Sequence, residues 1–286
     1  MQRHNRAAYG FLAPYLAIFL AFWIWPIISS FVISLHQTRV SPWQFRPAAN
    51  WGRLISDPAF FNALKNTLII LIIQVPVMIG LATVIAVFLN SPLLKAKGLF
   101  RFAFFAPVVV GEVAYSAVFR LMFAQDFGVV NKLLSSVGLP AIDWLSNPTA
   151  ALALVMIALT WRWTGYNAII ILAGLQAIPG DVYEAATLDR VSKVRQFFFI
   201  TLPLLKPVIT FSVILSISGT MQLFTEPYLI TNHGGPGGAT ETLGLLLYRQ
   251  AFLSGNVGYA SAIAYTIAGL AMIVSLIQLR LSREAK

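Results

Sequence analysis

The chain has 286 residues, of which 58% are hydrophobic and only 10% are charged, and its net charge is +10. Soluble domains carry about 25% charged residues, so this composition excludes an ordinary water-exposed surface and indicates a membrane protein. The absence of cysteine excludes disulfides, thiolate catalysis and cysteine metal sites, and the three histidines are too scattered to form a ligand motif. The basic residues lie in short loops beside apolar runs, which favours a topological role over nucleic-acid binding.

Six apolar stretches are long enough to cross a bilayer, which requires about 20 helical residues. The first follows the basic "MQRHNR", but its length and its lack of a small-residue cleavage site favour a retained helix over a signal peptide. Glu112, Arg162 and Glu226 interrupt the third, fourth and fifth stretches. The predicted fold class is an all-α membrane protein with one transmembrane domain over residues 1–286. Its six spans are expected at about 11–35, 67–89, 102–124, 150–175, 207–230 and 259–281.

Lysine and arginine are distributed unevenly between the two sides of these spans. The N-terminus, the 90–101 loop, the 176–206 segment and the C-terminus together hold twelve of them, and the other three loops hold seven over a greater length. Cytoplasmic loops carry the excess of these residues in membrane proteins. We therefore expect a multi-pass protein with both termini in the cytoplasm.

The segment 181–207 is polar and basic although it lies between two apolar stretches. Asp181 is followed three residues later by Glu184, which is typical of a helix N-cap with its capping-box partner. We expect one helix from Val182 to about Asp189, and a second helix after a turn. Ser192 is expected to cap the second helix, which should run toward Leu202 and end at the prolines at positions 203 and 207. An ordinary solvated loop with a topological role explains the same residues equally well.

Charged residues at membrane depth are costly and usually face a cavity or pair with one another. Arg162 stands between two tryptophans and is followed by Tyr166 and Asn167, a combination of aromatic faces and hydrogen-bonding groups that suits a sugar. A structural ion pair between Arg162 and Glu112 is the alternative interpretation. The candidates for a substrate pathway are Glu112, Arg162, Tyr166, Asn167, Gln222, Glu226 and Tyr228.

The segment "EAATLDR…ITLPLLKP" resembles the cytoplasmic EAA loop of inner-membrane permease subunits in binding-protein-dependent ABC importers. The upstream "LAGLQAIPGDVYEAA" is similar to the carbohydrate branch, the maltose and glycerol-3-phosphate permease-like family. Further matches extend over nearly the whole chain, at "LISDPAFFNALKNTL", "KGLFRFAFFAPVV" and "FGVVNKLLSSVGLPAIDWLS". The stretch "EPYLITNHGGPGGATETL" resembles the first-type permease of a heteromeric pair.

The resemblance implies that this loop docks on a separate ATPase subunit and transmits its closure to the membrane spans. The residues that would take part are Glu184, Ala185, Ala186, Asp189, Arg190, Leu202 and Pro203. Arg190 stands where the family usually has glycine. If that position needs a left-handed backbone, the substitution costs about 1 kcal/mol.

The same resemblance implies the partners and cofactors. They are a second permease, two copies of a cytoplasmic ATPase, an extracytoplasmic solute-binding protein, membrane lipid and a carbohydrate or polyol substrate, with no nucleic acid. The chain has no Walker pattern. We therefore expect it not to be an enzyme and to bind no cofactor, with ATP and Mg²⁺ held by the partner ATPase in a bacterial or archaeal inner membrane.

Two other classes of function were weighed against this interpretation. A self-sufficient secondary transporter or channel predicts inverted repeats and coupling-ion carboxylates inside the spans. The sequence shows no convincing inverted repeat and only two acidic residues well inside. A membrane scaffold without transport leaves the charged residues at membrane depth unexplained.

Overall fold

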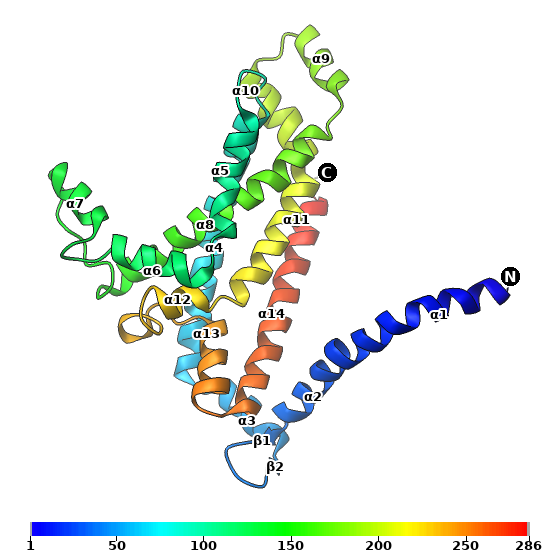
Figure 1. The fold of residues 1–286 in the computed structure, drawn as a ribbon, viewed down its shortest axis with the longest axis vertical. Coiled ribbons are helices and arrows are strands. Elements are labelled where there is room, and N and C mark those ends of the chain that lie inside the picture. Colours follow the sequence, from blue (N-terminus) through cyan, green and yellow to red (C-terminus); the bar gives the residue numbers. More distant parts are fainter. Residues whose placement is uncertain (1, 285–286) are drawn as a thin grey trace. The chain divides into compact units, whose positions relative to one another are not determined.

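The computed structural model describes the backbone of residues 2–284 and the side chains of residues 11–282, so both chain ends lie outside it. Nearly all of its elements are helices (Figure 1). In this described part, five helical segments are long and apolar enough to cross a membrane. A sixth crossing arises if α5 (Lys97–Val109) and α6 (Glu112–Met122), bent by 95°, form one broken span. The predicted all-α membrane fold is therefore confirmed, with five to six apolar helices where six spans were predicted.

Two of the expected spans have a different form in the structure. The stretch expected at 102–124 is interrupted at Val110 and Gly111, where the backbone is extended instead of helical. The stretch expected at 207–230 ends earlier, because α11 (Leu202–Met221) stops at Met221 and a short separate helix, α12 (Thr225–Leu229), follows. Both breaks lie next to the charged residues that the sequence places at membrane depth.

The chain divides into two compact units. The first unit consists of Met1–Phe60 and Leu246–Ala268, and the second consists of Phe61–Leu245 and Gly269–Lys286. The first unit contains α1 (Gln2–Phe19), a π-helical turn (Leu20–Ile24), α2 (Trp25–Ser34), β1 (His36–Gln37), β2 (Gln44–Phe45) and α3 (Pro47–Leu54). The two strands pair antiparallel, with His36 opposite Phe45. The first part of α14 (Val257–Glu284) completes this unit.

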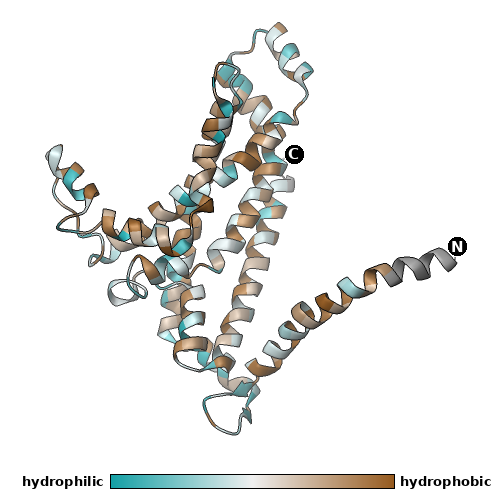
Figure 2. Ribbon diagram, viewed as in Figure 1, coloured by the Kyte–Doolittle hydropathy of each residue, from teal (hydrophilic) through white to brown (hydrophobic). Residues whose placement is uncertain are grey.

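The helical segment Phe11–Ser34 exposes its apolar side chains to the surroundings. None of its most apolar window is buried inside the structure, and Figure 2 shows apolar residues along it. Phe11, Trp23 and Trp25 are among its exposed aromatic residues. Such a surface is stable where lipid or another apolar surface covers it.

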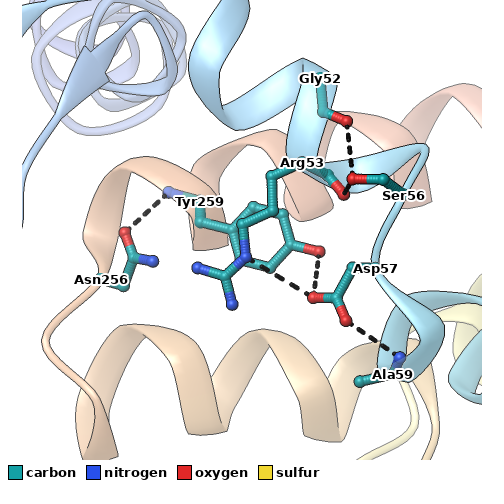
Figure 3. Close-up of polar contacts among 7 residues, drawn as sticks. All are labelled: Gly52, Arg53, Ser56, Asp57, Ala59, Asn256 and Tyr259. Carbon is teal, nitrogen blue, oxygen red and sulfur yellow. Dashed lines mark hydrogen bonds and ion pairs between the residues drawn. The ribbon is translucent and has the colours of Figure 1, made fainter.

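A polar cluster joins α3, the start of α4 (Pro58–Asn90) and α14 within the first unit (Figure 3). The Tyr259 hydroxyl donates to Asp57 Oδ2 at 2.8 Å, and the Arg53 guanidinium carbon lies 4.0 Å from the centre of the Tyr259 ring. Asp57 Oδ1 accepts from the N–H of Ala59 at 3.0 Å, which satisfies one free donor at the start of α4. The carboxylate of Asp57 therefore caps α4 and binds α14 through Tyr259.

The second unit is organised around α8 (Pro148–Gln176). Asn147 begins this helix, since its side-chain oxygen accepts from the N–H groups of Thr149 and Ala150 at 3.0 and 3.1 Å. Buried residues of α8 form hydrophobic clusters with α4, α6 and α11. The unit also contains α5, α7 (Val129–Ser136), α9 (Gly180–Leu188), α10 (Lys193–Gln196), a π-helical turn (Phe197–Thr201), α12, a 3-10 helix (Pro236–Gly238), the start of α13 (Leu243–Tyr248) and the second part of α14.

Close contact between α5 and α8 requires a glycine. A Cβ atom on Gly165 would lie 1.7 Å from the carbonyl oxygen of Phe104. Small residues allow membrane helices to approach this closely. Gly165 thus lets α5 cross α8 one turn after Arg162.

We predict that Asp57→Ala lowers the stability of the protein, because it removes both the cap on α4 and the acceptor for Tyr259. The expected loss is about 1–3 kcal/mol in the free energy of unfolding, measured as thermal unfolding in detergent. The matched control is Asp57→Asn, which retains an acceptor for the Ala59 N–H and should cost less. Equal losses for both variants would contradict the capping role.

Candidate functional site

A cavity of about 400 Å³ lies among α4, α8, α11 and the segment that follows α11. This volume falls within the roughly 300–1,000 Å³ range of small-molecule sites. Aromatic and amide side chains provide much of its wall. The lining residues are Gln74, Met78, Glu112, Leu159, Trp163, Tyr166, Asn167, Leu215, Ser216, Gly219, Thr220, Gln222, Leu223, Phe224, Thr225 and Glu226.

Arg162 of α8 binds the break between α5 and α6. Its Nη1 donates to the carbonyl oxygen of Val110 at 3.0 Å, and its Nη2 lies 3.7 Å from Glu112 Oε1. Val110 directly follows the last residue of α5 and has an extended backbone, so its carbonyl has no helical N–H partner. Arg162 replaces that partner and also holds Glu112, the first residue of α6. The ion pair considered from the sequence is present, and its second role at the break had no sequence signal.

Two side-chain hydrogen bonds connect α6 to α12. Tyr115 donates its hydroxyl proton to Glu226 Oε1, and Thr225 Oγ1 donates to Glu112 Oε2 at 2.9 Å. Tyr115 and Glu226 are 2% and 4% exposed, whereas the side chain of Glu112 is 48% exposed. We call these four residues the α6–α12 clasp. One of its bonds is buried and the other reaches the cavity.

The start of the segment after α11 is fixed by contacts from farther along the chain. Thr242 donates its hydroxyl to the carbonyl oxygen of Leu223, and a Cβ atom on Gly244 would lie 2.5 Å from the carbonyl oxygens of Gln222 and Leu223. Glycine is therefore required at position 244 for this approach. These contacts hold Gln222 and Leu223, which line the cavity, outside the helix.

The cavity brings together five of the seven pathway candidates: Glu112, Tyr166, Asn167, Gln222 and Glu226. Arg162 lies behind the wall and is 6% exposed, and Tyr228 packs edge-on against His233 instead of lining the cavity. Sequence reasoning did not single out Gln74, although a polar residue inside the apolar stretch at 67–89 was a usable signal. Tyr115 gave no such signal, because a tyrosine in an apolar run is ordinary.

The basic segment 181–207 forms a helix, a turn and a second helix. After α9 the chain turns through Arg190, whose φ is 55°. The N–H of Arg190 donates to the Thr187 carbonyl and the N–H of Val191 to the Ala186 carbonyl, both at 3.0 Å, which is the Schellman pattern of a helix end. Arg190 therefore occupies the left-handed position that glycine favours. Ser192 caps α10 by accepting from the N–H of Arg195 at 3.4 Å.

Two details of the expected helix–turn–helix are wrong. Asp181 does not cap α9, because Pro179 is extended and the helix already begins at Gly180, which leaves Asp181 in the first turn. Pro203 and Pro207 do not end the second helix. A π-helical turn at Phe197–Thr201, closed by the Leu202 N–H bonding to the Phe197 carbonyl, carries the helix past them into α11.

The residues expected to contact a partner differ in their exposure. Glu184 and Ala185 on α9 and Asp189 directly after it are exposed, whereas Ala186 is 4% exposed and packs inside the chain. Leu188 is 85% exposed, which is unusual for a leucine at the end of a polar helix. It follows Glu184 by four residues and Ala185 by three, so the three side chains share one helical face. We call Glu184, Ala185 and Leu188 the α9 face.

Among the described residues, no group of three or more His, Asp and Glu side chains is arranged to hold a metal ion. The carboxylates in the cavity wall are Glu112 and Glu226, and each accepts one hydrogen bond within the α6–α12 clasp. The amide, hydroxyl and aromatic side chains of the wall can form hydrogen bonds and ring stacking.

Residues 22–286 match the family model of the binding-protein-dependent transport system inner membrane component. The chain is 44% identical over 280 residues to the lactose transport system permease protein LacF of Rhizobium radiobacter, covering 96% of this chain and 94% of that protein. It is 34% identical over 281 residues to the arabinooligosaccharides transport system permease protein AraP of Bacillus subtilis, covering 98% and 90%.

The fold is also found in a solved structure. A chain in the crystal structure of a bacterial alginate ABC transporter, in complex with an alginate pentasaccharide-bound periplasmic protein, superposes with a TM-score of 0.83. The match covers 99% of this chain and 96% of that chain at 21% identity, so it shows the fold alone. The resemblance inferred from the sequence is confirmed by these comparisons.

We predict that the two bonds of the α6–α12 clasp differ in strength. A double-mutant cycle of Tyr115→Phe with Glu226→Gln should give a coupling of about 1.5–3 kcal/mol, because both groups are buried and one is a carboxylate. The cycle of Glu112→Gln with Thr225→Val should give less than about 1 kcal/mol, because water competes at half-exposed Glu112. Unfolding in detergent measures both, and the reverse order would contradict the assignment.

Proposed function

Because this chain belongs to the family of binding-protein-dependent transport system inner membrane components, we propose that it is one of two permease subunits that form the pathway of an ATP-driven sugar importer. The cavity beside the two broken helices carries this proposal. It combines aromatic faces with amide and hydroxyl groups, which suits a molecule with apolar ring faces and hydroxyl edges.

Asn167 has the strongest geometric case for contact with the solute. Its Nδ2 donates to the Trp163 carbonyl at 3.0 Å, but its buried Oδ1 has no hydrogen-bond partner. A buried acceptor without a donor is costly, so a solute hydroxyl that displaces the groups covering Oδ1 gains a hydrogen bond there. Tyr166, Gln222 and Glu112 line the same cavity and complete the proposed contact set.

The α9 face is the proposed contact with the ATPase. Glu184 supplies directional charge, Ala185 allows close approach and Leu188 supplies apolar area. Ala186 has a supporting role, since it is buried and its carbonyl closes the turn at Arg190. Leu202 and Pro203 begin α11, so a displacement of the segment is transmitted directly into a membrane helix. ATP and Mg²⁺ belong to the partner ATPase, of which two copies are expected.

This arrangement supports a protein of a bacterial or archaeal inner membrane in which the α9 face and both termini are cytoplasmic. The lysine and arginine excess on that side supports the orientation. A solute-binding protein outside the cytoplasm delivers the sugar, and ATP hydrolysis on the partner biases the permease between outward-facing and inward-facing forms. A purified chain that transported solute down an ion gradient by itself would contradict this proposal and favour a secondary transporter.

We predict that Glu184→Lys abolishes ATP-driven uptake by reversing the charge on the α9 face. Asp126→Lys is the matched control, because Asp126 is an exposed carboxylate in the turn before α7. Uptake in vesicles and retention of the ATPase in detergent measure the effect. Since the chain has no cysteine, Leu188→Cys supplies a single thiol for crosslinking to the ATPase. Failure of that thiol to capture the ATPase in intact membranes would refute the docking face.

We also predict that Asn167→Leu reduces sugar uptake by about tenfold or more, because it replaces a buried hydrogen-bonding group by an apolar one of similar size. Assembly with the ATPase should be unchanged, since Asn167 lies on α8 and the docking face lies on α9. The measurement is initial uptake rate at equal amounts of assembled complex. Unchanged uptake would remove Asn167 from the pathway.

A further inference from the structure

The cavity wall contains acidic side chains but no basic ones. Glu112 and Glu226 line it, and no lysine, arginine or histidine is among the described residues that do. The remaining polar groups of the wall are neutral amides and hydroxyls, such as those of Gln74, Asn167 and Ser216. A solute in the cavity therefore meets negative charge and neutral hydrogen-bonding groups.

Arg162 is the nearest positive charge, but it is not available to a solute. The residue is 6% exposed, its Nη1 is bonded to the Val110 carbonyl and its Nη2 lies 3.7 Å from Glu112. The Tyr115 ring covers the guanidinium, with the guanidinium carbon 4.6 Å from the ring centre. Its charge is compensated inside the protein, so it offers no binding site for a carboxylate or sulfonate on a solute.

Of the two acidic residues, Glu112 is the one that a solute can reach. Its side chain is 48% exposed, whereas Glu226 is 4% exposed and bonded to Tyr115. The Glu112 carboxylate accepts one hydrogen bond from Thr225 and faces Arg162. A carboxylate has about four lone-pair sites, so it can accept further bonds from solute hydroxyls.

We infer that Glu112 makes this permease selective for neutral, hydroxyl-rich solutes and excludes anionic ones. Its exposed carboxylate accepts bonds from hydroxyl donors and repels a negative group at the same place. Arg162, 3.7 Å away, offsets part of this charge from behind the carboxylate, but it is buried and offers an anion no exposed donor. This inference rests on the proposed function and adds the charge of the substrate. The fold alone does not set that charge, since a transporter that shares it is involved in the import of the acidic polysaccharide alginate.

The charge of the cavity can be measured without any solute. Because the chain has no cysteine, Ser216→Cys places a single thiol in the cavity wall. The rates of labelling by anionic sulfonatoethyl methanethiosulfonate and by neutral hydroxyethyl methanethiosulfonate are compared in the assembled importer. The ratio of the anionic to the neutral rate is divided by the same ratio for a free cysteine derivative. Differences in the intrinsic reactivity of the thiol cancel in this normalised ratio.

We expect this normalised ratio at Ser216→Cys to be about tenfold below that of the free thiol, because a like charge opposes the anionic reagent. Glu112→Gln should raise the ratio severalfold, and the matched variant Glu112→Asp, which keeps the charge, should leave it low. The same Glu112 variants should not change the ratio at Ser136→Cys, an exposed position on α7 that lies outside both the cavity and the α9 face. If Glu112→Gln left the labelling ratio at Ser216→Cys unchanged, the inference would be overturned.

Protection experiments then test the selection of solutes. In membranes that contain the importer without its solute-binding protein, lactose should slow the labelling of Ser216→Cys by the neutral reagent, and digalacturonate should not. Glu112→Gln should allow digalacturonate to protect. If both sugars protected equally with Glu112 present, the charge selection would be overturned, while the proposed solute pathway would stand. If neither sugar protected in any variant, the proposed solute pathway would be contradicted, and the charge selection with it.

Discussion

The membrane part of this protein depends on one buried guanidinium. Arg162 bonds the free carbonyl at the end of α5 and lies 3.7 Å from the carboxylate at the start of α6, so a single side chain stabilises a 95° bend in an otherwise apolar stretch. An unsatisfied carbonyl at membrane depth would cost several kcal/mol. Arg162 thus fixes the start of α6, and the bonds to α12 and the packing on α8 hold the rest of that helix.

The bend in turn creates the α6–α12 clasp. Because α6 leaves the direction of α5, Glu112 and Tyr115 face the short helix α12 rather than a lipid surface. Glu112 also forms one part of the cavity wall. Glu112 thus links the charge of the cavity to the position of the broken helices. It lies beside Arg162, accepts a bond from Thr225 and lines the cavity.

The sequence predicted most of the apolar helices because hydrophobic length is a local property. It also predicted a turn after the first helix of the 181–207 segment, because the residues around that turn are polar and a capping serine follows. The left-handed backbone at Arg190 was only a condition raised by the family's usual glycine, and the structure meets it. It failed at Pro203 and Pro207, because a π-helical turn relieves the missing N–H groups in a way that residue type does not reveal. It also overlooked Leu188, whose exposure depends on what the rest of the chain leaves uncovered.

Hydrophobic runs, basic loops and the EAA segment were enough to establish a multi-span membrane protein, because each arises from neighbouring residues. Which polar residues face one another was decided by packing among helices distant in sequence. Glu112, Arg162 and Glu226 come from three different stretches, and their grouping follows from the bend at Val110 and the early end of α11. Both features depend on partners more than ten residues away, Arg162 for the first and Thr242 for the second, and local periodicity carries no information about such partners.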